Sequence, residues 1–427
     1  MKINYQPVRP ATVDMLQNIC GEDAVIFGDE KKLRKYSHDQ IPEEKYAHMP
    51  EVVVLPQTAR QVADIMKLAN RESIPVTPRA AGSGLSGGAV PIYGGILLSI
   101  ERMNQIIEID ADNLMAVVEP GVVTNQLDEV LKEYGLFFAG YPMSEEFCYI
   151  GGNVAENAGG GRAIKYGVTG RYIRGIEVVT PTGEIIALGG KRIKDVTGYN
   201  LLGLMIGSEG TLGIFTQITI KLLPRPSVRK AILVLFEIDG SHEKQAMENA
   251  ETICKLCAQK GAVEYHLASA DAEIERFWKI RKQIPWVLKR YSLHQSIEDI
   301  VVPIANIPKI LHHIQKLEKK YNIMIPVFGH AGDGNLHAHP MKNPEQSLEH
   351  WEEMLPQLLT DIYNQTAELG GTISGEHGIG HKRRDYMELV MSDAQLAVMR
   401  KIKNALDPNN ILNPGKIFRT TTDHSFS

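Results

Sequence analysis

Short apolar runs alternate with amphipathic segments along the first half of the chain. A short apolar run bounded by turn residues predicts a buried strand, and a longer segment with apolar residues three and four apart predicts a helix. The predicted strands are EVVVLP (51–56), GGILLSI (94–100) and NLMAVVEPGVV (113–123), and the predicted helices are TARQVADIMKLANRESI (58–74) and TNQLDEVLKEYG (124–135). GIEVVTPTGEIIAL (175–188) predicts a hairpin that turns at residues 181–183.

The alternation continues after LLPRPS (222–227), a proline-rich stretch that marks a domain boundary. The predicted strands are KAILVLFEI (230–238), AVEYHLA (262–268) and IEDIVVPI (297–304), and the predicted helices cover 242–261, 271–291, 307–322 and 348–371. Pro285 lies within the second of these helices and is expected to kink or divide it. From about residue 381 the chain is predicted to be mostly helical. The whole pattern is that of a mixed α and β protein whose helices pack on sheets.

Composition limits the possible function classes more than it limits the possible folds. The chain has 427 residues, of which 43% are hydrophobic and 23% charged, as is ordinary for a soluble globular protein of two or three domains. A net charge of −5 favours neither nucleic acid nor an anionic membrane as a partner. We find no apolar run long enough for a membrane span and no signal-peptide core, so we expect a cytoplasmic protein.

The four cysteines match neither a disulfide framework nor the ligands of an iron–sulfur cluster. Cys254 and Cys257 form a CxxC pair, which can serve redox chemistry or half of a metal site. No second pair follows, and the surrounding residues have helical spacing and end on glycine. We interpret the pair as two positions on a structural helix.

Glycine is concentrated in three segments of the first half, at 75–91, 148–167 and 194–224. Glycine lets backbone N–H groups approach an anion such as a diphosphate. The first segment contains Gly82-Ser83-Gly84 but not the strand, GxGxxG and helix of a dinucleotide-binding fold, so NAD is not indicated. A single glycine-rich loop can be a set of plain turns, but three in one region favour a binding site.

Three histidines lie close together in FGHAGDGNLHAHP (328–340). On a strand, His337 and His339 would share a face. The Gly332-Asp333-Gly334 turn signal would instead bring His330 back beside His337. Spacing alone does not choose between these pairs, and a metal site, a catalytic base and ordinary hydrogen-bonded histidines all remain open.

A second polar stretch, ISGEHGIGHKRRD (373–385), places Glu376 and His377 between glycines. Taken alone it is also compatible with a polar loop at the start of a helix. Together with the histidine segment it offers two imidazoles and one carboxylate, a set that binds a divalent ion and leaves positions open for a substrate.

Six motifs stand in an order that resembles the FAD-linked 2-hydroxyacid dehydrogenases, a family that includes D-lactate dehydrogenases, D-2-hydroxyglutarate dehydrogenases and the flavin subunit of glycolate oxidase. The motifs are PRAAGSGLSGGAVP, IGGNVAENAGG, DVTGYNLLGLMIGSEGTLGI, GHAGDGNLH, GEHGIG and DPNNILNPGK, spread over roughly residues 36 to 418. The resemblance implies an α+β fold with a two-subdomain FAD-binding domain of the vanillyl-alcohol-oxidase type and an α/β substrate-cap domain. We expect the FAD-binding domain at 1–223 (core about 46–223), the cap with its metal site at 224–380, and a helical segment returning to the FAD domain at 381–427.

The same resemblance assigns residues to FAD. They are Pro78, Arg79, Ala80, Ala81, Gly82, Ser83, Gly84, Leu85, Ile150, Gly151, Gly152, Asn153, Ala155, Asn157, Gly159, Gly160, Gly167, Glu209, Gly210, Ile214 and Asn413. Some relatives of the wider fold tether FAD through a histidine in the first loop, and since that loop has none here, we expect non-covalent FAD. The chain departs from the family pattern at GYPMSEEFC (140–148), where a Pro-Asp-Pro-Ser-Ser-like stretch is usual.

By the resemblance, His330, His337 and Glu376 hold one divalent metal, with zinc expected first and Fe(II) or Mn(II) as alternatives. His377 is then the general base, and His339 lies near the substrate. Such a metal can chelate the hydroxyl and carboxylate of a 2-hydroxyacid and make the hydroxyl easier to deprotonate. Hydride passes from the substrate to flavin, which does chemistry that side chains do not.

Arg281 matches the arginine that pairs with the substrate carboxylate in the family, and a guanidinium suits a carboxylate because it donates two parallel hydrogen bonds. Hydroxyglutarate enzymes add a threonine and a lysine for the distal carboxylate, and these positions are Pro285 and Ile297 here. An apolar wall disfavours a second carboxylate. We therefore expect a small monocarboxylate, D-lactate before glycolate.

Three functions remain to be weighed: a D-2-hydroxyacid dehydrogenase, a zinc hydrolase in which the same ligands activate water, and an electron-transfer subunit that binds FAD without turnover. The hydrolase leaves the glycine segments unexplained, and the four intact site residues argue against the third. A dehydrogenase without iron–sulfur cysteines must pass its electrons to an external carrier, such as an electron-transfer flavoprotein, a quinone or a partner subunit.

Overall fold

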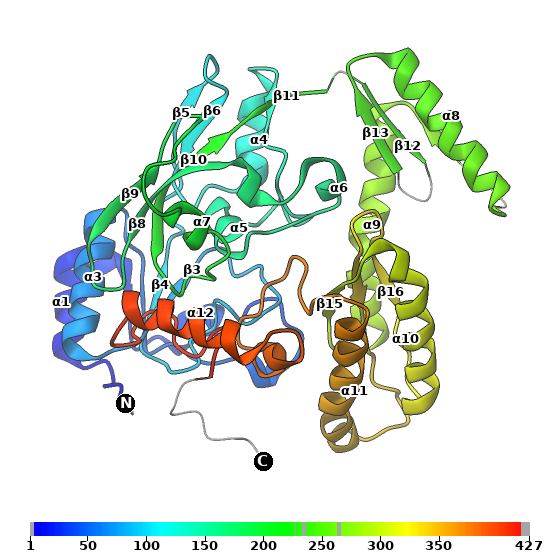
Figure 1. Cartoon of the computed structure of the whole chain (residues 1–427). Helices are drawn as coiled ribbons and strands as arrows, with labels where there is room; N and C mark the ends of the chain where they lie inside the picture. The colour runs from blue at the N-terminus through cyan, green and yellow to red at the C-terminus, as the bar shows by residue number, and fades with distance from the viewer. Residues whose placement is uncertain (1–3, 227, 233–235, 263–265, 420–427) are drawn as a thin grey trace. The chain divides into compact units, whose positions relative to one another are not determined.

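The computed structural model of the chain describes residues 4–226, 228–232, 236–262 and 266–419 (Figure 1). The chain forms two compact units, each described here by itself. The larger unit comprises the residues up to 134, residues 138–222 and the residues from 294 onward, and the smaller comprises 135–137 and 223–293. The residues that we predict as one cap domain, 224–380, are divided between these units, and where the functional domains begin and end stays a prediction.

A four-stranded sheet of order β1-β2-β4-β3 opens the larger unit, with β2, β3 and β4 parallel and β1 antiparallel. Its elements are α1 (Pro10–Cys20), β1 (Val25–Ile26), α2 (Glu30–Leu33), β2 (Val52–Val54), α3 (Ala59–Glu72), β3 (Val76–Arg79) and β4 (Ile96–Ser99). The predicted strands at 51–56 and 94–100 and the predicted helix at 58–74 are confirmed. Thr58 caps α3 by accepting a hydrogen bond from the Gln61 amide, and the apolar face of α3 packs on the sheet.

A five-stranded antiparallel sheet of order β5-β6-β10-β8-β9 follows. Its strands are β5 (Ile106–Asp110), β6 (Met115–Val118), β8 (Ile173–Val179), β9 (Ile185–Gly189) and β10 (Ile214–Lys221). The helices of this stretch are α4 (Thr124–Lys132), α5 (Ile150–Glu156), α6 (Ala163–Tyr166) and α7 (Leu201–Met205). The predicted hairpin is confirmed as β8 and β9. The second glycine segment is not wholly loop as we expected, because α5 crosses it and ends at Asn157 in the left-handed conformation.

A three-stranded antiparallel sheet of order β15-β17-β16 carries the histidine segment. The strands are β15 (Glu298–Val301), β16 (Val327–His330) and β17 (Asn335–Ala338), and α10 (Ile307–Tyr321) and α11 (Leu348–Glu368) lie side by side and pack with it in one core (Figure 1). The last helices of the described part are the 3-10 helix η6 (Arg384–Leu389) and α12 (Asp393–Leu406). They agree with the helical structure predicted from about residue 381. A bridge from Leu412 to Val76 then adds the end of the chain to the first sheet.

The smaller unit pairs β7 (Leu136–Phe137) with β11 (Leu223–Pro224) and holds a sheet of order β13-β12-β14. Its remaining elements are β12 (Val228–Ile232), β13 (Phe236–Gly240), α8 (Glu243–Gln259), β14 (Leu267–Ala268) and α9 (Asp271–Tyr291). The single strand predicted at 230–238 is wrong, since β12 and β13 pair as a hairpin whose connecting residues lie outside the described part. Part of the strand predicted at 262–268 lies there too.

Two further predictions concern the helices of the smaller unit. α9 runs through Pro285 as one helix, so Pro285 does not divide it. Cys254 is buried on α8 beside Ala250, and Cys257 follows on the same helix, which confirms the helix predicted around the CxxC pair.

Candidate active site

The β16–β17 hairpin brings two histidines together. His330 pairs in register with Asn335, and His337 lies opposite Phe328. Between the strands the chain turns through Gly334, which has a φ of 85°. As a result, the His330 and His337 rings meet edge to face with their centroids 5.5 Å apart. The turn interpretation of GHAGDGNLH is therefore the one that the structure adopts.

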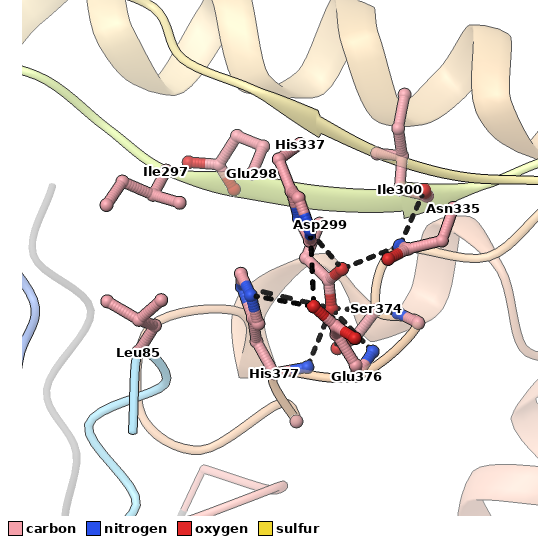
Figure 2. Close-up of polar contacts among 12 residues, drawn as sticks. Leu85, Ile297, Glu298, Asp299, Ile300, Asn335, His337, Ser374, Glu376 and His377 are labelled. Carbon is pink, nitrogen blue, oxygen red and sulfur yellow. Dashed lines mark hydrogen bonds and ion pairs between the residues drawn. The ribbon is translucent and has the colours of Figure 1, made fainter. Parts of the chain in front are cut away.

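The loop after α11 brings Glu376 and His377 to the same place (Figure 2). Ser374 on this loop forms a parallel bridge with Asp299 of β15, which fixes the loop beside the sheet. Glu376 Oε1 lies 3.2 Å from His337 Nε2, 3.6 Å from His330 Nε2 and 3.7 Å from His377 Nε2. The His337 and His377 rings stack with centroids 4.9 Å apart and planes 2° apart. Three imidazole nitrogens thus converge on one carboxylate oxygen.

Burial and the neighbouring groups together set the protonation of Glu376 and His377. Burial alone would raise the pKa of the Glu376 carboxyl, but the neighbouring His330 and His337 outweigh it and hold that pKa well below its usual range. Burial lowers the pKa of His377 to about 4, against the charge of Asp299, which acts to raise it. At neutral pH the site therefore contains an ionised Glu376 and a neutral His377 imidazole, which is able to accept a proton.

Asp299 is the site residue that our sequence reasoning missed. Its side chain is fully buried, and Oδ2 accepts hydrogen bonds from the Glu376 amide at 2.8 Å and the His377 amide at 2.7 Å. Burial raises its pKa, but the charges of His377 and His337 outweigh this and the pKa lies below its usual value. The signal was present in IEDIVVP, where two carboxylates interrupt an apolar strand; a carboxylate at a buried strand position needs partners.

The proposed metal ligands fit a divalent cation. His330 Nε2 is buried and has no hydrogen-bond partner among the described residues, although it faces Glu376. Distances alone also group Asp299, His337, Glu376 and His377 within 4.8 Å of one another. We retain His330, His337 and Glu376 as the proposed ligands, because the oxygens of Asp299 already accept hydrogen bonds from the surrounding loop and from Asn335.

His339 does not join this cluster. It is buried, its Nδ1 lies 3.5 Å from Gln295 Oε1, and its ring packs on Phe328 with centroids 4.7 Å apart. Phe328 in turn contacts His337, with centroids 5.6 Å apart. His339 is thus one aromatic ring away from the cluster, and its role near the substrate stays a prediction. Arg281 and Pro285 lie on α9 of the smaller unit, so the proposed role of Arg281 also stays a prediction.

The first glycine loop has the features of an anion nest. None of the backbone N–H groups of residues 81–85 donates a hydrogen bond to another residue in the described part of the chain. Gly82 has a φ of 68°, and Gly152 of α5 faces Ala80 so closely that an added Cβ would lie 3.1 Å from the Ala80 Cβ. Free amides and a left-handed glycine are features of loops that bind a diphosphate, and the close packing of Gly152 on Ala80 fixes α5 beside this loop.

The residues that we assigned to FAD divide into two groups. Partly accessible ones, able to touch a ligand, are Pro78, Ala80, Ala81, Ser83, Gly84, Leu85, Gly152, Ala155, Asn157 and Gly167. Buried ones, which support the loops, are Arg79, Gly82, Ile150, Gly151, Asn153, Gly159, Gly160, Glu209, Gly210, Ile214 and Asn413. The Glu209 carboxylate, for example, accepts hydrogen bonds from the Ile379 and Gly380 amides, and the Asn413 amide donates to the Gly88 carbonyl.

Comparison with known proteins agrees with this geometry. Residues 50–189 match the model of an FAD binding domain, and residues 214–417 match that of the C-terminal domain of FAD linked oxidases. The chain is 36% identical to glycolate oxidase subunit GlcD of Bacillus subtilis, over 90% of this chain and 92% of the relative. It is 33% identical to D-lactate dehydrogenase of Anaerostipes hadrus, over 97% of this chain and 98% of the relative.

The chain belongs to the FAD-linked 2-hydroxyacid dehydrogenase family. It is an FAD-dependent oxidoreductase. Of the three functions weighed above, this favours the dehydrogenase over the zinc hydrolase and the non-catalytic electron-transfer subunit. The family resemblance that we drew from the six motifs is confirmed.

The solved structures agree on the fold. p-Cresol methylhydroxylase with substrate bound superposes with a TM-score of 0.76 at 18% identity, over 96% of this chain and 97% of that one. The predicted α+β fold with an FAD-binding domain of this type is confirmed. Among the described residues of this family member, no helix is long and apolar enough to cross a membrane.

Proposed function

We propose that the protein oxidises a small D-2-hydroxyacid to the 2-oxoacid, with D-lactate favoured and glycolate next, using non-covalent FAD and one divalent metal, zinc first. The observation that carries this proposal is the convergence of His330, His337 and His377 on Glu376 Oε1 in a chain whose family is FAD-linked. A reduced flavin then passes its electrons to an external carrier.

Each site residue has a part in the proposed reaction. His330, His337 and Glu376 would hold the metal, which when bound supplies Lewis acidity to the substrate hydroxyl. His377 accepts the hydroxyl proton at Nε2, the nitrogen that faces Glu376. FAD, when bound, supplies the acceptor for the C2 hydride. Arg281 would pair with the substrate carboxylate.

Two apolar side chains near His377 support a small substrate. Figure 2 shows Leu85 of the first glycine loop and Ile297 on the side of His377 that faces away from Asn335. The fully buried Arg383 holds the two backbones, since its guanidinium donates to the Leu85 carbonyl at 3.3 Å and to the Ile297 carbonyl at 2.7 Å. A distal carboxylate placed against these two side chains would lose its hydration without gaining a partner.

Anaerobic bleaching of the bound flavin tests the proposal. The FAD-loaded protein is mixed with D-lactate, L-lactate, glycolate and D-2-hydroxyglutarate, with and without prior removal of metal by a chelator. We expect rapid bleaching by D-lactate, slower bleaching by glycolate, little by the other two, and none after chelation until Zn²⁺ is restored. A flavin that no small 2-hydroxyacid bleaches would overturn the proposal, and faster bleaching by D-2-hydroxyglutarate would overturn the substrate assignment.

A further inference from the structure

We propose that Asp299 is the positioning residue of this site and not a metal ligand: its single carboxylate holds the backbone of Glu376 and His377 by hydrogen bonds, and its negative charge attracts the Nδ1–H edge of the His337 and His377 rings. The inference rests on the proposed function for the roles of the two histidines. It adds to that function the group that makes their Nε2 atoms face the metal and the substrate.

The two Nδ1 atoms face the two oxygens of Asp299. His337 Nδ1 lies 3.5 Å from Oδ1, and His377 Nδ1 lies 4.0 Å from Oδ2. Both Nδ1 atoms are buried and form no hydrogen bond in the part of the chain that the structure describes, so the carboxylate acts on them through its charge. Since the rings are parallel within 2°, contact of both Nδ1 atoms with one carboxylate points both Nε2 atoms the same way, toward Glu376.

The lone pairs of Asp299 are already in use. Oδ2 accepts from Ser374 Oγ and from the amides of Gly375, Glu376 and His377, at 2.9, 2.9, 2.8 and 2.7 Å. Oδ1 accepts from Asn335 Nδ2 at 2.8 Å. A carboxylate has about four lone-pair positions, and these five donors already occupy them, so none remains for a cation and the two Nδ1–H groups interact with Asp299 through its charge. Asp299 therefore differs from Glu376, whose Oε1 faces three imidazole nitrogens.

The same hydrogen bonds link the orientation of the rings to the order of the loop. A fully buried carboxylate is costly unless it is satisfied, and the 374–377 loop satisfies Asp299. Figure 2 shows the neighbouring Glu298 on the opposite side of the strand. There Glu298 contacts Lys382, Arg383 and Tyr363 instead. β15 thus places one carboxylate on each of its two faces, and of these two only Asp299 lies beside His337 and His377.

The test uses Asp299→Asn in the FAD-loaded full chain. An asparagine carries no negative charge, so both Nδ1–H groups lose the charge that they face. We expect a 10- to 100-fold weaker affinity for Zn²⁺, the usual effect of losing such an outer partner, measured by competition with a chromophoric chelator. Ser374→Ala is the matched control, because it removes one hydrogen bond to the same oxygen and touches neither ring. It should keep the Zn²⁺ affinity within about threefold of the wild-type value.

A second readout needs no variant of Asp299. In Zn²⁺-loaded wild-type protein with ¹⁵N-labelled histidine, NMR should show the Nδ1–H tautomer at two rings, assigned by their loss in His337→Gln and His377→Gln. Nε2–H tautomers at these rings would overturn the inference even where Asp299→Asn fails to fold.

Two further outcomes decide against the proposal. Unchanged Zn²⁺ affinity and tautomers in Asp299→Asn would show that Asp299 positions nothing. Complete loss of Zn²⁺ binding with unchanged tautomers would make Asp299 a ligand. Neither readout depends on turnover, so a flavin that no 2-hydroxyacid reduces would overturn the proposed function while the zinc and NMR results still decide on Asp299.

Discussion

His377 is the residue on which the proposed chemistry depends most. We predict that His377→Ala lowers the rate of flavin reduction by D-lactate by a factor of about 10² to 10⁴, the usual contribution of a general base. FAD and metal contents should stay at wild-type levels, because neither the glycine-rich segments assigned to FAD nor the three proposed metal ligands change. Stopped-flow absorbance gives the rate, and His313→Ala on α10 is the control. Reduction at the wild-type rate in the His377 variant would rule out the base.

His381 should make stability depend on pH. Burial, together with the charges of Arg384, Lys416 and His48, lowers the pKa of His381 to about 2, and its ring packs against Tyr46 and His48. Because the folded pKa lies below the unfolded value of about 6.5, the protein keeps its full stability above that pH and loses it as the pH falls below.

The variant that tests this is His381→Gln. Between pH 7 and pH 5 the wild-type protein should lose about 1 kcal/mol more free energy of unfolding than this variant, after allowance for partial solvent screening. Urea unfolding at the two pH values gives the difference, with His242→Gln, at an exposed histidine, as control. Equal losses in the wild type and in His381→Gln would contradict the prediction.

Side chains that carry chemistry could be predicted from the sequence, whereas the partners of the positioning residue Asp299 could not. His330, His337, Glu376 and His377 sit in motifs rich in glycine, and the structure brings all four together. Asp299 is hidden in a strand that is otherwise apolar, and its partners come from a loop far along the chain. Partners this remote leave no periodic signal in one sequence.

At the scale of single elements, the β16–β17 turn determines whether the metal ligands meet. Gly334 has a φ of 85°, and a Cβ added there would lie 2.0 Å from the Val302 carbonyl oxygen. We predict that Gly334→Ala weakens Zn²⁺ binding at least tenfold, because the turn must shift and His330 moves with it. Zinc content after dialysis measures the effect.

Gly28→Ala is the control for this turn. Gly28 also has a positive φ, 73°, but a Cβ added there meets nothing within 4 Å. Both variants bear the strain of a left-handed alanine, about 1 to 2 kcal/mol, and only Gly334→Ala bears the clash. Equal zinc contents in the two variants would contradict the assigned role of the turn.

Elements with clear periodicity were predicted correctly, and those decided by tertiary contacts were not. α3 and α11 show amphipathic spacing over many residues, so their sequences suffice. α5 is rich in glycine and reads as a loop, yet its buried Ile150, Gly151 and Val154 form a helix inside the unit. α9 runs through Pro285 although a proline removes one helical hydrogen bond.

At the scale of the whole molecule, the smaller unit carries the residue expected to select the substrate. We predict that Arg281→Met raises the KM for D-lactate about 10- to 100-fold, the equivalent of about 1.5 to 3 kcal/mol for a lost hydrogen bond to a charged group. Zinc and FAD contents should not change. Steady-state kinetics with an artificial electron acceptor gives KM, and Lys282→Met is the neighbouring control. An unchanged KM in Arg281→Met would contradict the predicted role.

The end of the chain completes the first sheet. The Val76 amide donates to the Ile411 carbonyl at 2.8 Å, and the Asn413 amide donates to the Val76 carbonyl at 2.7 Å. Ile411 and Leu412 are fully buried in the same core as α3. During synthesis on the ribosome, the cofactor-binding half therefore emerges first. Its strand β3 gains its last neighbour only after residues 411–413 have been synthesised. Until then its apolar surface is open to chaperones and to aggregation, and a product truncated shortly before residue 411 would never close it.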